Sequence, residues 1–215
     1  MSLRSPAFQE STRKRSADLF PGLLRDSGAL DLGGGASEGD VLAYLRDRRF
    51  RGYEAAAAIS WLGMYGTLDA VPVLKEATSS SDTEVRAEAA EAVGEIARAR
   101  EAPFYLDCLT RSDFRPKSVA MRLLLRYGDA SAVDAVIERA KRVLRNGLRN
   151  EGSMRMEVAW AALFVRRYED ENEVAERFYE HVYERWGRLK SYEQVELEWL
   201  ASHVWEKRKR VPGAG

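Results

Sequence analysis

Apolar residues from Ser37 onward recur every three or four positions, which is the period of amphipathic α-helices. Ser37 and Asp40 have the spacing of a capping box and stand directly ahead of the apolar Val41 and Leu45, so the first helix is expected to begin here. Charged residues interrupt every apolar run well short of the roughly 18 residues that a membrane-spanning helix needs. No membrane span is therefore expected.

The same pattern divides the chain into three regions. Residues 1–36 contain two prolines, scattered serines and the run Gly33–Gly35, and they show no sustained helical or strand period. Such a composition is typical of linkers and chain ends. We expect a flexible N-terminal arm at 1–36, a helical repeat domain with capping helices at 37–210, and a tail at 211–215.

The expected arm carries one group of large apolar side chains, Leu19, Phe20, Leu23 and Leu24, around Pro21. Exposed apolar clusters are uncommon, so the group needs a surface to cover it. Two interpretations stay open. The group either lies on the protein's own first helices or acts as a short docking segment for a partner.

The helical region repeats itself with a period of 31 residues. The equivalent residues are Gly63 and Gly94, Pro72 and Pro103, and, two periods apart, Tyr65–Gly66 and Tyr127–Gly128. Val85–Ala90 returns as Met154–Ala159 at an offset of 69 residues, so the third unit carries seven extra residues. Self-similarity at such a period predicts an array of four helical units.

The residue types of one unit explain why it would need neighbours. Asp82 can cap the helix that begins near Thr83, and Pro103 suits the first turn of the second helix, where its missing N–H costs nothing. A face of small residues lies between them: Ala89, Ala90, Ala92 and Val93. Small residues allow helices to approach closely, and stacked pairs can bury a face that one pair cannot, so we expect a solenoid.

The segment from Asp82 to Ile96, DTEVRAEAAEAVGEI, resembles a HEAT repeat of the short bacterial subset that is also found in phycobilisome lyases. Residues 50–78 and 113–140 resemble it more weakly, because Ala55 and Lys117 stand where the repeat has an arginine. Met154 to Leu163 is similar to its first helix again, so that the resemblance covers roughly residues 38–190.

This resemblance implies an all-α fold: a right-handed α-solenoid of about four HEAT-like helical hairpins with a helical C-terminal cap. Members of the family usually act as protein-binding scaffolds. Some bind nucleic acid, and a few are enzymes, including lyases and HEAT-like DNA glycosylases.

The carboxyl-terminal part reads as the cap. Asn172 is expected to open a helix, and Ser191 with Gln194 to form a capping box for the next one. The apolar face of the first helix would comprise Val174, Ala175, Phe178, Val182, Tyr183 and Trp186. The second face would include Val195, Leu197, Trp199, Leu200 and Val204. Basic residues at 207–210 suit the negative end of the last helix dipole.

Charge is balanced overall but not along the chain. Lys and Arg together number 34, as do Asp and Glu, so no global field attracts nucleic acid or an anionic membrane. Residues 37–110 nevertheless have eight basic and thirteen acidic residues, a net charge of −5, whereas 111–150 have ten basic and four acidic residues, a net charge of +6. The two regions therefore form charge poles along the array.

The basic region includes a candidate partner-binding stripe of Arg142, Arg145 and Arg149, with Arg139 at its margin. Glu138 lies one turn before Arg142, and we expect these two residues to pair. The stripe is either a solvated helix face or an electropositive ridge for an acidic protein or for phosphates.

Candidate chemistry is sparse. A single cysteine, Cys108, excludes an internal disulfide and is expected in the core. His181 and His203 are expected at the surface and leave too few ligands for an ordinary zinc site. We expect no catalytic site, metal or cofactor. No apolar signal region follows Arg13–Arg15, so cytoplasmic residence is the default expectation.

Two functions follow from this reading. The first is a non-enzymatic scaffold or adaptor that binds another protein, of unknown identity, through exposed helix faces and the arm. The alternative is a nucleic-acid-binding or base-processing HEAT-like protein that uses the basic region 111–150 and one or more tryptophans. Trp61 and Trp160 fall inside the small-residue helices, where packing is the expected role.

Overall fold

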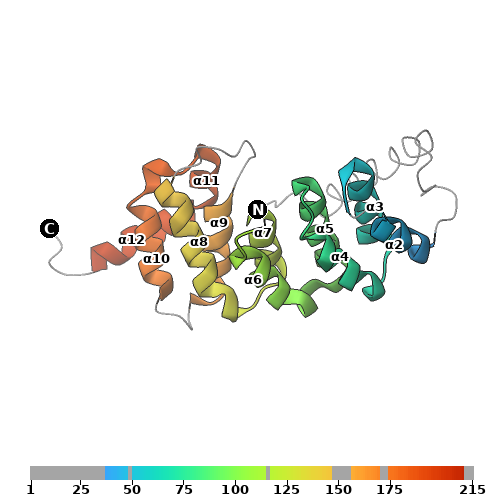
Figure 1. Ribbon diagram of the computed structural model, residues 1–215. Coiled ribbons are helices and arrows are strands. Elements are labelled where there is room, and N and C mark those ends of the chain that lie inside the picture. Colours follow the sequence, from blue (N-terminus) through green and yellow to red (C-terminus); the bar gives the residue numbers. More distant parts are fainter. Residues whose placement is uncertain (1–36, 48–49, 115–116, 147–155, 170–173, 211–215) are drawn as a thin grey trace. The chain divides into compact units, whose positions relative to one another are not determined.

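The computed structural model describes residues 37–47, 50–114, 117–146, 156–169 and 174–210 (Figure 1). These residues form α-helices joined by turns and short 3-10 helices, and none of them forms a strand. The expected all-α fold is therefore confirmed. The chain separates into two compact units: unit 1 runs up to Arg100 and includes Asp113–Pro116, and unit 2 comprises Glu101–Ser112 and the residues from Lys117 onward.

Unit 1 is built around one helix-helix contact. Its helices are α2 (Glu38–Asp47), α3 (Gly52–Tyr65), α4 (Val71–Ala77) and α5 (Thr83–Ala97), with the 3-10 helix η1 (Leu68–Ala70) ahead of α4. A second 3-10 helix, η2 (Arg98–Glu101), follows α5. Helix α3 packs most extensively on α5, while α2 packs on α3 and α4 packs on α5.

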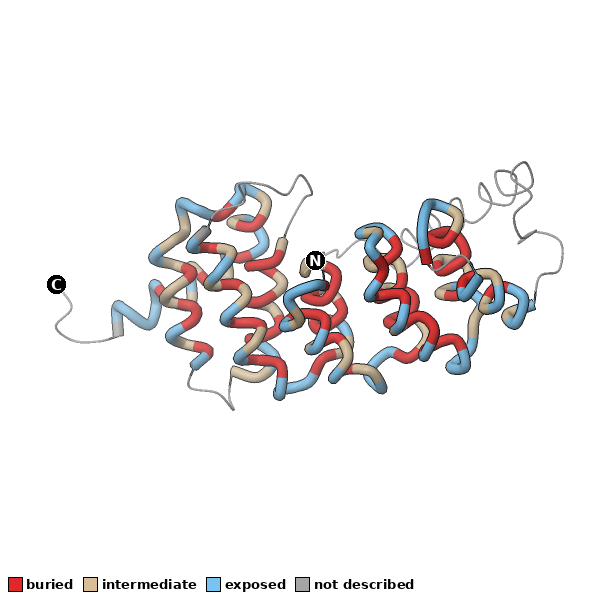
Figure 2. The backbone as a smooth tube through the Cα atoms, in the orientation of Figure 1, coloured by how far each residue is buried: buried red, intermediate tan, exposed pale blue. Residues whose placement is uncertain are grey.

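Small residues form this contact, as the sequence predicts. Ala89, Ala90, Ala92 and Val93 of α5 are all buried, and so is the alanine run of α3 from Ala55 to Ala58. Figure 2 shows buried positions recurring along both helices. A Cβ atom on Gly63 would lie 3.1 Å from both the Cα and the Cβ of Ala92. The glycine at this repeat position therefore permits the close approach of α3 and α5.

Unit 2 arranges its helices in two layers. They are α6 (Ala102–Thr110), α7 (Lys117–Tyr127), α8 (Val133–Asn146), α9 (Glu157–Arg166), α10 (Val174–Tyr183), α11 (Ser191–Glu196) and α12 (Glu198–Arg210). Two 3-10 helices, η3 (Ala130–Ala132) and η5 (Trp186–Arg188), precede α8 and α11. Helix α9 packs on α7 and α11 in one layer, and α8 on α6 and α10 in the other, with α12 beyond α10. Alternate helices stacking in two layers is the packing expected of helical repeats.

Three of the predicted helix starts are confirmed. The amide of Ser37 donates to the Asp40 carboxylate at 2.9 Å and the amide of Asp40 donates to Ser37 Oγ at 3.3 Å, which is a reciprocal capping box. Asp82 accepts a hydrogen bond from the amide of Glu84 at 2.9 Å and caps α5. Pro103 lies in the first turn of α6.

The recurring Tyr-Gly pair marks the end of the first helix of a repeat. The amide of Gly66 donates to the carbonyl of Leu62 at 2.7 Å, and that of Gly128 donates to the carbonyl of Leu124 at 2.8 Å. A Cβ atom on either glycine would lie 2.6 or 2.7 Å from the same carbonyl oxygen, respectively. Such a contact is too close for any larger residue, so the turn requires glycine at both positions.

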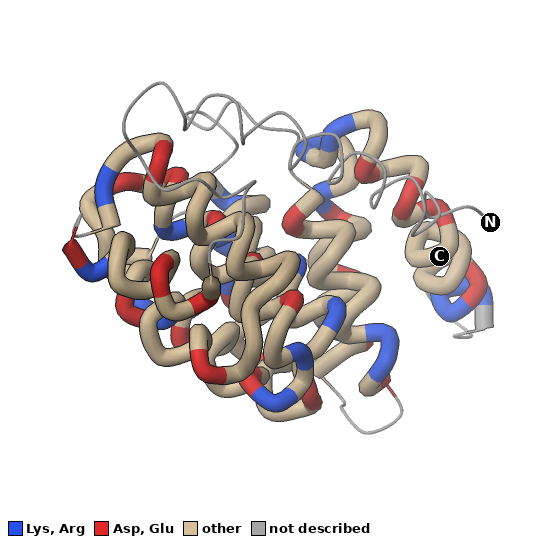
Figure 3. Tube along the Cα trace, turned by 90° about the vertical axis from the view of Figure 1, so that its right-hand side faces the viewer, with Lys and Arg blue, Asp and Glu red and all other residues tan. Residues whose placement is uncertain are grey.

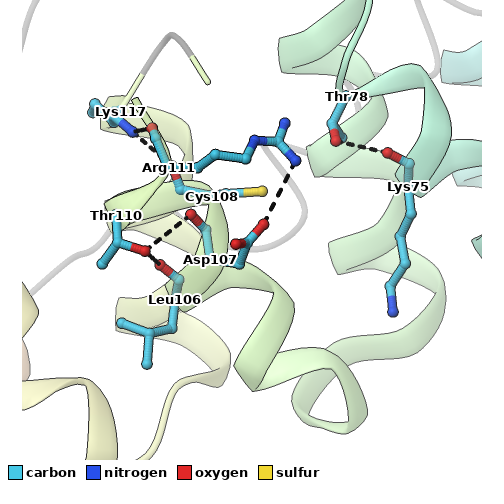
Figure 4. Close-up of polar contacts among 8 residues, drawn as sticks. All are labelled: Lys75, Thr78, Leu106, Asp107, Cys108, Thr110, Arg111 and Lys117. Atoms are coloured by element: carbon cyan, nitrogen blue, oxygen red, sulfur yellow. Dashed lines mark hydrogen bonds and ion pairs between the residues drawn. The ribbon is translucent and has the colours of Figure 1, made fainter. Parts of the chain in front are cut away.

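The basic residue of the repeat has a structural role. Arg86 donates to the carbonyl of Ser80 at 2.5 Å, and Lys117, one repeat later, donates to the carbonyl of Arg111, also six residues earlier (Figure 4). The two contacts are equivalent because 31 residues separate both the donors and the acceptors. Ala55, at the same position of the first repeat, has no side chain that could do this.

The carboxyl-terminal cap differs in detail from its prediction. The carboxylate of Glu193, not the pair of Ser191 and Gln194, closes the start of α11 by accepting from the amide of Lys190 at 3.2 Å. Helix α11 then ends after one and a half turns, and α12 begins at Glu198 as a separate helix. Val195, predicted on the apolar face, is 72% exposed. The side chain of Gln194 instead donates to the carbonyl of Trp186 at 3.0 Å.

Helix α10 largely matches the prediction. Ala175, Phe178 and Val182 are buried, whereas Val174, at the first residue of the helix, is exposed. The end of a helix lies at the edge of its apolar face, where a neighbouring element no longer covers it. Asn172, the expected first residue, lies outside the described residues.

Candidate partner-binding surface

Helix α8 has separate acidic and basic ends on its outer side. Its buried residues are Val133, Val136, Ile137, Ala140 and Leu144. Asp134 and Glu138 are exposed in its first half, and Arg142 and Arg145 are exposed in its second half. This order of charges complements the helix dipole, which is positive at the amino end and negative at the carboxyl end.

Arg139 belongs to the packing of unit 2 rather than to its surface. Its guanidinium donates to the two carboxylate oxygens of Glu157 at 2.6 and 3.1 Å. The Arg139 side chain is 19% exposed and that of Glu157 only 1%. A two-point contact of this kind joins α8 to α9. The binding role of Arg139 therefore stays a prediction. Its contacts with Glu157 do not favour that role, because they hold the guanidinium within unit 2.

Glu138 pairs with a different residue from the expected one. Its carboxylate lies 3.0 Å from Lys141 Nζ, three residues along α8, so the predicted pair with Arg142 is wrong. Both i,i+3 and i,i+4 positions are neighbours on a helix, and side-chain rotamers decide between them. Arg142 and Arg145 remain exposed beyond this pair.

A residue distant in the sequence adds to the basic end of α8. Arg188, in η5, donates to the carbonyl of Leu144 at 3.1 Å and to that of Arg145 at 3.4 Å. The last four carbonyls of a helix have no partner within the helix, and a cation there also opposes the helix dipole. Arg188 therefore satisfies the end of α8 and places a further positive charge beside Arg145.

The pKa of His181 reflects the charged residues around it, some of which belong to α8. Its Nδ1 atom lies 3.0 Å from Nη1 of Arg185. Burial lowers the pKa of His181, and the positive charges of Arg185 and Lys141 lower it further. The imidazole is therefore neutral near pH 7, because protonation would add a charge to a surface that is already positive.

We call the group formed by Lys141, Arg142, Arg145, Arg185 and Arg188 the basic face. Three of these residues come from α8 and two from the segment that follows α10. Arg142 and Arg145 are recognisable in the sequence as a basic stripe, but nothing in the helical spacing predicts Arg185 and Arg188 as their neighbours. The one sequence signal for this part of the basic face is the group of basic residues at 185, 188 and 190.

Other basic residues of 111–150 are occupied by contacts within their own unit. Arg111 pairs with Asp107 at 3.5 Å, and Lys117 donates to the carbonyls of Cys108, at 3.0 Å, and Arg111 (Figure 4). Basic and acidic positions are interspersed along the chain in Figure 3. The net charge of this region is therefore not one continuous positive surface.

The other candidate residues from the sequence are Cys108, His203 and Arg149. Cys108 is buried, as expected. His203 lies near the surface, with Nε2 3.0 Å from Glu176, whose other carboxylate oxygen accepts from Lys207 at 2.7 Å. Burial raises the pKa of Glu176, but the hydrogen bonds from Lys207 and His203 outweigh it and leave that pKa lowered. Arg149 lies outside the described residues.

Further sites are limited in the part of the chain that the structure describes. No group of three or more His, Cys, Asp and Glu residues there could hold a metal ion. None of the described helices combines the length and the apolar character needed to cross a membrane. The apolar group of Leu19, Phe20, Leu23 and Leu24 falls outside these residues.

Comparison with protein families agrees with this architecture. The model of the family described as HEAT repeats matches residues 40–124, from the first turn of α2 to the last turn of α7. Residues 40–124 of this chain therefore contain HEAT repeats. HEAT repeats are commonly protein-interaction scaffolds and are generally non-enzymatic. Comparisons with curated proteins and with solved structures gave no significant match.

Proposed function

We propose that this protein is a non-enzymatic scaffold that binds an acidic segment of another protein through the basic face. The observation that supports it most is the exposure of Arg142 and Arg145 on a helix whose end is held by Arg188. Guanidinium groups on a fixed helix can make two-point contacts with carboxylates at a small entropic cost.

The arrangement of charges supports a protein partner more than a nucleic acid. A protein that neutralises about 6–10 phosphates gains a large electrostatic term in DNA binding, which falls steeply with salt. The basic face has five cations, of which Lys141 and Arg185 already contact Glu138 and Glu184, at 3.0 and 3.4 Å. A short acidic peptide carries few enough charges to match the remaining arginines Arg142, Arg145 and Arg188, whereas a nucleic-acid backbone would need more cations than the basic face offers.

The test is selection of peptides on the full-length protein, followed by measurement of their affinity. We expect the selected peptides to be rich in Asp and Glu, and the double change Arg142→Glu and Arg145→Glu to weaken their binding by about tenfold or more. Arg46→Glu with Arg51→Glu is the matched control, because both residues are exposed in unit 1 and the change in net charge is the same.

Two outcomes would overturn the proposal. The first is equal loss of binding in the control variant, since general attraction and not the basic face would then be responsible. The second is tighter binding of a labelled DNA or RNA strand than of any selected peptide at about 50 mM salt, which would favour the nucleic-acid alternative.

A further inference from the structure

The carboxyl-terminal end of α3 has exposed apolar side chains in addition to its buried face. One side of this helix packs on α5, but Trp61, Met64 and Tyr65 share another side at i, i+3 and i+4. Tyr65 is 62% exposed, Met64 38%, and Leu68, in the following turn of η1, 46%. The rings of Trp61 and Tyr65 lie 5.3 Å apart. We call these four residues the α3 apolar patch.

Such a patch is unusual on the outside of a repeat helix. The outer side of a surface helix is normally polar, whereas Glu54 is the only charged residue among the fourteen of α3. Clustered exposed apolar residues of this size commonly mark a binding surface.

The chain that precedes α2 emerges beside this patch. Glu38, the first residue of α2, accepts hydrogen bonds from the amide and the hydroxyl of Thr67 at 3.0 and 3.2 Å. Thr67 lies between Tyr65 and Leu68 in the sequence, so these contacts hold the start of α2 next to the patch. Ser37 is itself held by the capping box, which fixes the point at which residues 1–36 join α2.

We propose that residues 19–24 cover the α3 apolar patch in the same molecule, with Leu19, Phe20, Leu23 and Leu24 as the contacting side chains. Leu24 is thirteen residues from Ser37 in the sequence, and this linker can span up to about 45 Å. Helix α3 is only about 21 Å long, so the segment can reach the whole patch. A short linker also gives an effective concentration in the millimolar range, so that even weak contacts would be largely occupied.

Charge favours the same pairing. Residues 13–25 contain four basic residues and one acidic residue, a net charge of +3, whereas the region that includes α3 has a net charge of −5. Opposite charges guide a segment to the complementary surface, and like charges disfavour its binding elsewhere. The proposal is independent of the basic face on α8, which lies in unit 2.

Disulfide trapping in the full-length chain tests the proposal. Gly22 and Asp69 would be changed to Cys and the native thiol removed by Cys108→Ala, which leaves every proposed contact residue in place. In a glutathione buffer we expect the intramolecular disulfide to show an effective concentration about tenfold above that of a control pair, Gly22→Cys with Ser79→Cys. Ser79 is exposed in the same unit, after the other end of α4.

Adding Phe20→Ser and Leu23→Ser should reduce the trapped pair to the control level. Equal effective concentrations for the two pairs would overturn the proposal, because the segment would then have no preference for the patch. Disulfide-linked dimers that increase with protein concentration would overturn it as well, since the segment would then cover a second copy.

A second measurement keeps Cys108 and so does not depend on that change. Phe20→Ser with Leu23→Ser should uncover the patch and raise the fluorescence of a dye that binds exposed apolar surface. Adding Met64→Ser and Tyr65→Ser should remove this increase, while adding Val195→Ser, at an even more exposed apolar position in unit 2, should not. An unchanged signal in the first variant would contradict the proposal.

Discussion

The two units stack helices by different means. In unit 1, α3 and α5 approach through alanines and Gly63, and the contact is close enough that a Cβ on the glycine would meet Ala92 at 3.1 Å. In unit 2, α8 and α9 are joined by the nearly buried pair of Arg139 and Glu157. Small side chains permit close helix packing, and the unpaired carbonyls at helix ends need polar partners.

Long polar side chains supply those partners in unit 2. Three contacts between residues distant in the sequence illustrate this: Arg167 to the carbonyl of Leu125 at 2.6 Å, Tyr168 to the carbonyl of Gly128 at 3.0 Å, and Arg188 to the carbonyl of Leu144 at 3.1 Å. The close small-residue contact thus distinguishes unit 1, whereas polar contacts between distant residues occur in both units, such as Thr67 to Glu38 and Ser80 to Phe50 in unit 1. The two should respond differently to substitution.

The largest effect should come from breaking the ion pair of unit 2. Glu157→Ala leaves Arg139 largely buried without its carboxylate, and we expect a loss of about 3 kcal/mol in the free energy of unfolding, measured by urea titration. Arg139→Met with Glu157→Met removes both charges and should restore the stability to within about 1 kcal/mol of the natural protein. If the double variant were as unstable as the single one, the size of the side chains and not their charge would matter here.

The tight contact of unit 1 should be nearly as sensitive. Gly63→Val places methyl groups against the backbone of Ala92, and we expect a loss of about 2 kcal/mol by the same titration. Gly39→Ala is the control, because its Cβ would meet only Ser37 Oγ at 3.6 Å and should leave the stability unchanged or slightly higher. A similar small effect at both positions would show that α3 and α5 can move apart without cost.

The smallest effect concerns pH in unit 2. Burial raises the pKa of Glu193 above its usual 4.5, and the negative charge of Glu157 adds to this, although the amides of Lys190 and Val158 oppose it. The folded state therefore holds this proton more tightly than the unfolded state does. Stability from this group is fully present below the unfolded pKa and is lost as pH rises through the folded pKa.

Glu193→Gln tests that sign. The difference in unfolding free energy, natural protein minus variant, should fall as the pH is raised from about 4 to 7. Glu196→Gln, an exposed position on the same helix, should give a difference that stays flat. A difference that rises with pH would mean that the ionised form of Glu193 is stabilised, contrary to the effect of its burial.

The repeat architecture could be predicted because its signals are local. The capping box of Ser37 and Asp40, the cap at Asp82 and the small face of α5 depend on residues within one helix or turn. The period of 31 residues then shows that each unit resembles the next. The capping box of α11 was predicted one residue out of place, with Ser191 and Gln194 instead of Lys190 and Glu193. Ser191 is the more usual N-cap residue, whereas the buried carboxylate of Glu193 makes the contact in the structure.

The sequence by itself determined most of the helices and their inward faces, with α11 as the exception, since these follow from propensity and periodicity along a short stretch of chain. Only the tertiary structure decided that Arg139 is bound to Glu157, that Arg188 lies at the end of α8, and that the start of α2 lies beside an exposed apolar patch. Each of these contacts joins residues 18 to 44 positions apart. A long charged side chain at the surface has several partners within reach, and packing of the helices selects one of them.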